Sequence, residues 1–152
     1  MGDIQAVRCS PNDEEFLGLV NELDTYLSHY NGPDREFYSG FNNLDSLVGA
    51  VVARRGSEPV GCGAFRRRGN DRGEVKRMYV RPDSRGQGIA RIVLTELEKW
   101  AAELELDCLQ LETGSFMEDA RRLYESAGYR YIPNFPPYVG LEASVCMEKR
   151  IR

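Results

Sequence analysis

The sequence is poor in the residue types that build metal sites and disulfide frameworks. Its 152 residues include one histidine, His29, and four cysteines that lie far apart, Cys9, Cys62, Cys108 and Cys146. A zinc site normally takes cysteine and histidine ligands at short spacings, and a disulfide framework takes paired cysteines. We therefore expect no metal ion, and we expect the cysteines to be reduced thiols in the core.

Long apolar runs and a positive net charge are also missing. No segment approaches the roughly 18 consecutive apolar residues of a membrane span, which excludes a membrane protein. The first ten residues, MGDIQAVRCS, lack the basic flank and apolar run of a signal peptide, so we expect a cytoplasmic protein. The net charge of −4 and the pI of about 5.2 argue against a nucleic-acid binder. The basic run at 66–68 is more typical of a solvated strand end.

What remains is an ordinary soluble composition. Hydrophobic residues make up 41% of the chain and charged residues 29%, as in typical globular proteins. A chain of this length buries a continuous core without help from metals or disulfides. Because no repeat, linker or low-complexity tract interrupts the sequence, we expect a single domain over residues 1–152.

The order of apolar patterns predicts a mixed α/β (α+β) fold. A helix is expected at 12–29, where acidic residues occupy the first turn, Asn12 or Ser10 is the candidate N-cap, and His29 would cap the C-terminus. Runs rich in β-branched residues between turn formers predict strands at 4–9, 46–54, 60–68, 74–80, 107–113, 129–132 and 144–151.

Two further helices are predicted where the apolar period changes from 2 to 3.6 residues, from Gly88 to about Leu104 and over 115–128. The first of them connects strands 74–80 and 107–113, which should therefore be parallel. The three strands before it form an antiparallel meander. The expected result is a central, mostly antiparallel sheet of six to seven strands with helices on both faces, with strand 144–151 extending it to an edge.

The stretch RPDSRGQGIA has two glycines directly before a predicted helix. Gly86 and Gly88 carry no Cβ, and the first amides of a helix have no internal partner, so this helix start suits an anion such as a pyrophosphate. Arg85, with Arg81 or Arg91, would add formal charge. The alternative is a glycine-rich turn that only lets the chain reverse closely.

Two phosphate-binding motifs do not match this stretch. A Walker loop needs a lysine after its last glycine, and a dinucleotide fingerprint needs glycine or alanine where the chain has Arg91. The pattern Arg85-x-x-Gly88-x-Ala90 does fit. It resembles the Arg/Gln-x-x-Gly-x-Gly/Ala pyrophosphate signature of the GCN5-related N-acetyltransferases, the GNAT superfamily.

The resemblance covers roughly residues 46–132 and includes LETG at 111–114 and ARRLYESAGYRYI at 120–132. It implies a GNAT fold in which the two central parallel strands splay apart, with acetyl-CoA as co-substrate lying in the opening. By this analogy, backbone groups of Met78 and Val80 pair with the pantetheine arm and the loop amides hold the pyrophosphate. The implied cofactor-binding residues are Met78, Tyr79, Val80, Arg85, Gly86, Gln87, Gly88, Ile89, Ala90 and Arg91.

Acetyl transfer to an amine needs a neutral nitrogen, yet an alkylamine with a pKa of about 10.4 is neutral in only about one molecule in 2,500 at pH 7. A general base is therefore useful. Glu74 precedes Val80 by six positions, as the base glutamate does in well-known GNAT members, so the resemblance implies that role. The alternative is a plain surface ion pair between Glu74 and Lys76 on the same strand face.

Tyr124 matches the tyrosine that the family places beside the coenzyme A sulfur, which implies a general acid, although its helical apolar face also allows a packed aromatic. Tyr129 and Tyr131 are expected in the core and sheet. The acceptor is expected to be a small-molecule or peptide amine that lies near residues 30–45 and 133–140, and its identity stays open. So do a homodimer and the alternative of a non-catalytic acyl-CoA sensor on the same fold.

Overall fold

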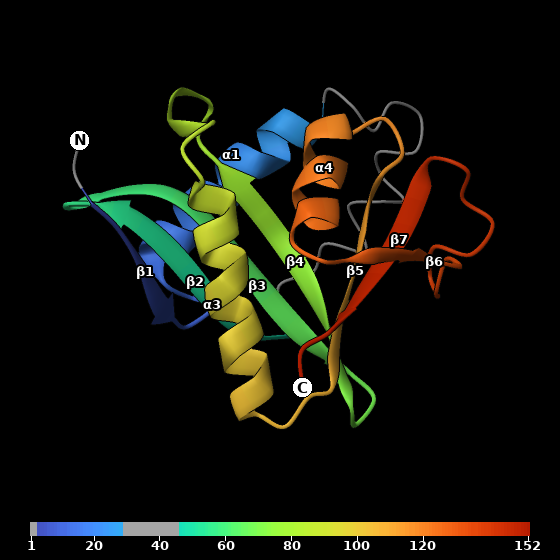
Figure 1. Cartoon of the computed structure of the whole chain (residues 1–152). Helices are drawn as coiled ribbons and strands as arrows, with labels where there is room; N and C mark the ends of the chain where they lie inside the picture. Colours follow the sequence, from blue (N-terminus) through green and yellow to red (C-terminus); the bar gives the residue numbers. More distant parts are fainter. Residues whose placement is uncertain (1–2, 29–45) are drawn as a thin grey trace.

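The computed structural model describes residues 3–28 and 46–152, and within these ranges it contains a seven-stranded mixed sheet with helices on both faces (Figure 1). The sheet order is β1-β2-β3-β4-β5-β7-β6. The strands are β1 Ile4–Cys9, β2 Leu47–Arg55, β3 Glu58–Arg68, β4 Arg72–Val80, β5 Cys108–Gly114, β6 Arg130–Ile132 and β7 Ser144–Arg150. The helices are α1 Glu14–Leu27, α3 Ile89–Glu103 and α4 Glu118–Ser126, with a short 3-10 turn at Pro82–Ser84.

The predicted fold class is confirmed. Strands β1 to β4 pair antiparallel in sequence order, β4 pairs parallel with β5, and β7 pairs antiparallel with both β5 and β6. The prediction that the final strand extends the sheet to an edge is wrong, because β7 lies between β5 and β6 and β6 forms the edge. No described helix is long and apolar enough to cross a membrane.

Helix α1 begins at a different cap from the two that were predicted. The side chain of Asp13 accepts hydrogen bonds from the amides of Glu15 and Phe16 at 3.1 Å, so Asp13 takes the role expected of Asn12 or Ser10. Within the described residues the helix ends at Leu27. The C-cap predicted for His29 lies outside those residues.

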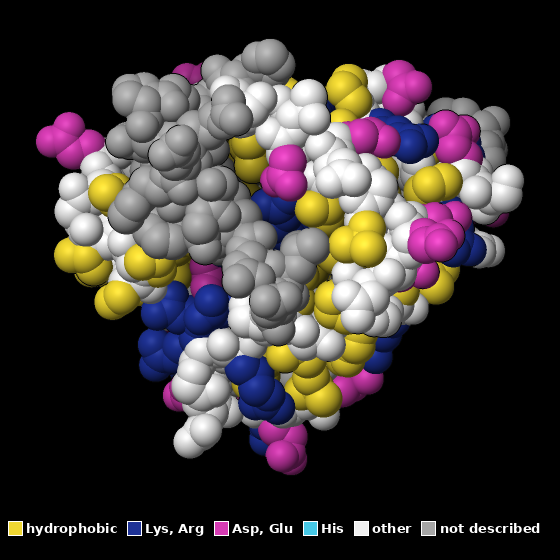
Figure 2. Space-filling model, turned by 180° about the vertical axis from the view of Figure 1, so that it is seen from behind, with side chains coloured by type: hydrophobic (Ala, Val, Ile, Leu, Met, Phe, Trp, Pro, Cys, Tyr) yellow, Lys and Arg dark blue, Asp and Glu magenta, His cyan; other side chains and the backbone are white. Residues whose placement is uncertain are grey.

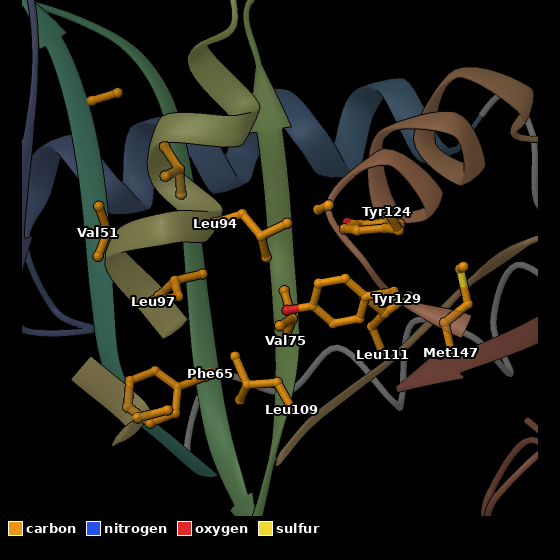
Figure 3. Close-up of a cluster of buried hydrophobic side chains, with 14 of the residues drawn as sticks. Val51, Phe65, Val75, Leu94, Leu97, Leu109, Leu111, Tyr124, Tyr129 and Met147 are labelled. Carbon is orange, nitrogen blue, oxygen red and sulfur yellow. The ribbon is translucent and has the colours of Figure 1, made fainter. Parts of the chain in front are cut away.

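The sheet is covered on both faces by apolar side chains. Helices α3 and α4 pack on one face around residues such as Leu94, Leu97 and Tyr124 (Figure 3), and the apolar stripe of α1 packs on the other around Phe16 and Leu19. All four cysteines are free thiols, as predicted. Cys62, Cys108 and Cys146 are buried, whereas Cys9 is only partly buried and so does not lie fully in the core as expected.

The two central parallel strands are joined by a short seam. Residues 72–74 of β4 pair with 108–110 of β5, yet β4 continues to Val80 and β5 to Gly114 without further pairing between them. This confirms the splayed arrangement that the resemblance implied. Beyond the seam, one edge of each strand carries backbone groups that the neighbouring strand does not use.

Strand β4 also contains a bulge at Arg77. The register with β3 shifts between Cys62, which pairs with Tyr79, and Ala64, which pairs with Lys76. Arg77 adopts a positive φ of 60°, which is rare and costly for a residue with a Cβ. The guanidinium of Arg77 reaches α1, where it forms an ion pair with Asp24.

Helix α4 starts at Glu118, three residues after the predicted start at Ser115. The chain first makes a tight turn in which the Met117 amide donates to the Gly114 carbonyl at 3.0 Å. A Cβ on Gly114 would lie 2.8 Å from the Phe116 ring, so this turn requires glycine for the close approach.

Candidate functional site

A cavity of about 680 Å³ opens where β4 and β5 separate. Its walls come from the end of α1, the bulged half of β4, the loop before α3, the end of β5 and one side of α4. Glu74 and Tyr124 both line it. So do nine of the ten predicted cofactor residues, namely Met78, Tyr79, Val80, Arg85, Gly86, Gly88, Ile89, Ala90 and Arg91. Gln87 is not part of this lining, and its side-chain oxygen accepts a hydrogen bond from Arg55.

Both glycines of the loop before α3 adopt a left-handed backbone conformation. Gly86 and Gly88 have φ values of 78° and 79°, and a Cβ at either position would meet nothing within 4 Å. Backbone geometry, not crowding, therefore selects glycine here. The amides of Gly86, Gln87 and Gly88 donate to no backbone carbonyl within the described ranges. Together with the first amides of α3, they form a row of donors at a helix start.

The arginines around this loop are positioned differently from one another. Arg85 turns back toward β4, where its Nε donates to the carbonyl of Val80 at 3.0 Å and its guanidinium lies 5.0 Å from the Tyr26 ring centroid. Arg91 lines the cavity from the first turn of α3. Arg81 is bound to a glutamate of α1 and is not among the lining residues, so it is not the extra cation that the sequence suggested.

Glu74 lies at the deep end of the seam and is only 2% exposed. Its carboxylate accepts a hydrogen bond from the Tyr138 hydroxyl at 3.4 Å. Three cations approach the same carboxylate, with Lys76 Nζ at 3.7 Å, Arg66 Nε at 3.6 Å and Arg68 Nη1 at 3.9 Å. The predicted surface pair with Lys76 is therefore wrong in its location, because both side chains are buried. Two arginines of the 66–68 run are likewise part of this cluster and not only of a solvated strand end.

Burial shifts the pKa values of the groups around Glu74. It lowers the pKa of the Lys76 ammonium, whose Nζ also donates to the Tyr138 hydroxyl at 3.2 Å. Desolvation raises the pKa of Glu112 on β5, even though Ser144 Oγ donates to its carboxylate at 2.7 Å. In the view from behind, a basic side chain is visible in a recess next to hydrophobic and acidic side chains (Figure 2).

Sequence reasoning missed two members of this cluster as individual residues. Glu112 alternates with Leu109 and Leu111 in DCLQLET, which is the pattern of an ordinary strand with one polar face, so the local sequence did not mark it. Tyr138 lies in the segment 133–140 that was expected near the acceptor, and its ring lines the cavity. The other such segment, 30–45, lies outside the described residues.

Tyr124 reaches the cavity from α4. The residue is 6% exposed, and its ring packs edge-on to Tyr129 with centroids 5.8 Å apart. Burial, with a smaller contribution from the negative charge of Glu112, raises the pKa of Tyr124. The ring is thus packed in the core while the residue borders the cavity, so the two alternatives stated for it do not exclude each other.

Comparisons with known proteins agree with this geometry. The family model described as "Acetyltransferase (GNAT) family" matches residues 16–129. The IAA acetyltransferase of Azospirillum brasilense is 34% identical over 151 residues, which covers 98% of this chain and 99% of that protein. A solved structure from Klebsiella pneumoniae superposes with a TM-score of 0.82 at 31% identity over 98% of both chains. At the level of fold, the PaiA N-acetyltransferase of Thermoplasma acidophilum in complex with coenzyme A matches with a TM-score of 0.74 and 18% identity, covering 97% of this chain and 99% of that one.

Proposed function

Because the chain belongs to the GNAT family of acetyltransferases, we propose that it transfers the acetyl group of acetyl-CoA directly to an amine, with Glu74 as general base and Tyr124 as general acid. The observation that supports this most is that one cavity contains the glycine loop, the splayed strand edge and both of these side chains. The acceptor is a small-molecule or peptide amine.

The lining fits coenzyme A in two independent ways. The loop from Gly86 to Ala90 offers backbone amides without backbone partners at a helix start, which is the donor set that a pyrophosphate takes. The edge of β4 beyond Glu74 is left unpaired by β5, so an extended amide chain has backbone groups to bind there. When bound, acetyl-CoA supplies the acetyl group as a thioester.

Glu74 accepts the proton that the acceptor amine loses. Its carboxylate is held in place by the Tyr138 hydroxyl and by the surrounding cations, which fixes its orientation toward the cavity. Because the residue is almost fully buried, one water relays the proton from the amine to a carboxylate oxygen.

Tyr124 supplies a proton on the other side of the reaction. Its raised pKa means that the hydroxyl keeps its proton throughout the neutral range. It is therefore available to donate to the departing thiolate, and the packing of its ring against Tyr129 keeps it oriented.

A thiol-release assay with acetyl-CoA and a panel of amines tests the proposal. The panel contains alkylamines, amino acids, aminoglycosides, peptides with a free N-terminus and peptides with a free lysine. We expect release above hydrolysis with at least one class, together with an acetylated product detected by mass spectrometry. Calorimetric binding of coenzyme A without release for any class would instead support a non-catalytic sensor.

A further inference from the structure

Arg77 is a buried cation whose hydrogen-bonding capacity is largely unused. Its side chain is 2% exposed, and its Nη2 pairs with Asp24 on α1. Its Nε and Nη1 are buried and have no hydrogen-bond partner among the described residues. A guanidinium has five N–H donors in a rigid plane, and leaving buried donors of a charged group unpaired costs free energy. Among the described residues, two of the three nitrogens of this guanidinium therefore lack an acceptor.

The backbone keeps this cation at the cavity in spite of local strain. Arg77 is the bulged residue of β4 with a φ of 60°, a conformation that a residue with a Cβ avoids unless the surroundings impose it. Both Arg77 and its neighbour Lys76 line the cavity. The bulge thus places the consecutive residues Lys76 and Arg77 in the cavity wall.

Opposite charges line the same space. Glu74 on β4 and Glu112 on β5 are the carboxylates of the wall near the seam. Carboxylates suffice to receive the ammonium group of a simple amine. They do not explain a guanidinium with two unpaired nitrogens, because Glu74 is bound by Tyr138 and approached by three other cations, and Glu112 accepts from Ser144.

We propose that the acceptor carries a carboxylate beside its amine, as an amino acid does, and that Arg77 binds this carboxylate. The planar fork of a guanidinium matches the two oxygens of a carboxylate, and one negative charge balances the unpaired donors. The inference rests on the proposed function, since it names the acceptor class of the same site.

Matched acceptor pairs test the proposal with the wild-type protein. Each pair is an amino acid and its decarboxylated amine, for example phenylalanine with phenethylamine and leucine with isoamylamine. The amino acid is expected to have the higher kcat/KM, by roughly tenfold or more, which is the range of a charge-assisted hydrogen-bonded pair. Equal or better use of the decarboxylated amines overturns the proposal and leaves the acetyltransferase function intact. Absence of acetylation in both members of every pair, and across the amine panel, counts against the function itself.

Arg77→Gln separates recognition from structure. It should raise KM for the amino acid by roughly tenfold or more and leave KM for the paired amine within about twofold. Titration calorimetry of the amino acid into the coenzyme A complex gives the same comparison without turnover. A parallel loss with both acceptors, at an unchanged melting temperature, contradicts the proposal.

Asp24→Asn is the matched control. It removes the charge that Arg77 already contacts but leaves the guanidinium in place, and Asp24 is about half exposed. This variant should keep the preference for the amino acid. If it loses that preference as fully as Arg77→Gln does, the pair has only a structural role and the carboxylate assignment is wrong.

Discussion

Replacing Gly88 by alanine tests whether the glycine loop binds the pyrophosphate through its backbone. The φ of Gly88 is 79° and a Cβ there would meet nothing within 4 Å, so the substitution causes no steric clash. Its cost is conformational, about 1–2 kcal/mol for an L-residue in the left-handed region. If the loop relaxes to avoid this strain, its amides leave their positions, and the dissociation constant for coenzyme A should rise by a factor of about 5–30.

Gly69→Ala is the matched control for this prediction. Gly69 lies in the turn between β3 and β4, has a φ of 71°, and likewise has open space at its Cβ, but it does not line the cavity. The control should lower the melting temperature by about 2–8 °C, since 1 kcal/mol corresponds to about 2–4 °C for a chain of this size. Its calorimetric affinity for coenzyme A should equal that of the wild type. If Gly88→Ala also keeps wild-type affinity while it melts like the control, the loop backbone is not the ligand.

Three further substitutions test the proposed base, the proposed acid and the buried carboxylate of Glu112. Glu74→Gln should lower kcat/KM by about 10²–10⁴ near neutral pH, with a smaller deficit as the pH approaches the pKa of the acceptor amine; a deficit that is independent of pH would indicate a structural role. Tyr124→Phe should lower kcat and leave coenzyme A affinity unchanged, and because burial raises the pKa of Tyr124, both proteins should show the same basic limb in rate–pH profiles below about pH 10. Glu112→Gln should raise the melting temperature near neutral pH, because burial raises the pKa of Glu112 in the folded state. The contribution of Glu112 to the free energy of unfolding is therefore greatest below its unfolded-state pKa of about 4.3. That contribution is lost as the pH rises through the folded-state pKa. The gain should disappear in thermal melts at about pH 4, and a lower melting temperature at neutral pH would show that the ionised carboxylate is needed for packing.

Local pattern was enough for most elements of this fold. The alternation of IQAVRC predicted β1 with both of its ends, and the 3.6-residue apolar period from Gly88 to about Leu104 predicted α3 to within one residue at each end. The shift of the α1 cap from Asn12 to Asp13 reflects two adjacent side chains with nearly equal capping ability. Which of the two side chains caps the helix depends on how the apolar stripe of α1 is oriented toward the sheet, and the capping residues alone do not determine that orientation.

Non-local contacts were the part that local pattern could not provide. The insertion of β7 between β5 and β6 depends on pairing between distant segments, and nothing in the strand itself marks its neighbours. The cluster around Glu74 has the same origin, since Tyr138 is 64 residues away in the chain. The bulge at Arg77 is set by its register with β3, so no local pattern in β4 marked Arg77 as a residue with a positive φ.

The short seam between β4 and β5 divides the sheet into two hydrogen-bonded ladders, β1 to β4 on one side and β5, β7 and β6 on the other. Few amide protons are shared between these ladders, so each can open while the other stays closed. Native-state hydrogen exchange should then give a separate set of protection factors for each ladder. The two sets should become similar when a bound ligand contacts both β4 and β5. A ligand that binds both β4 and β5 would connect the two ladders beyond residues 72–74 and 108–110.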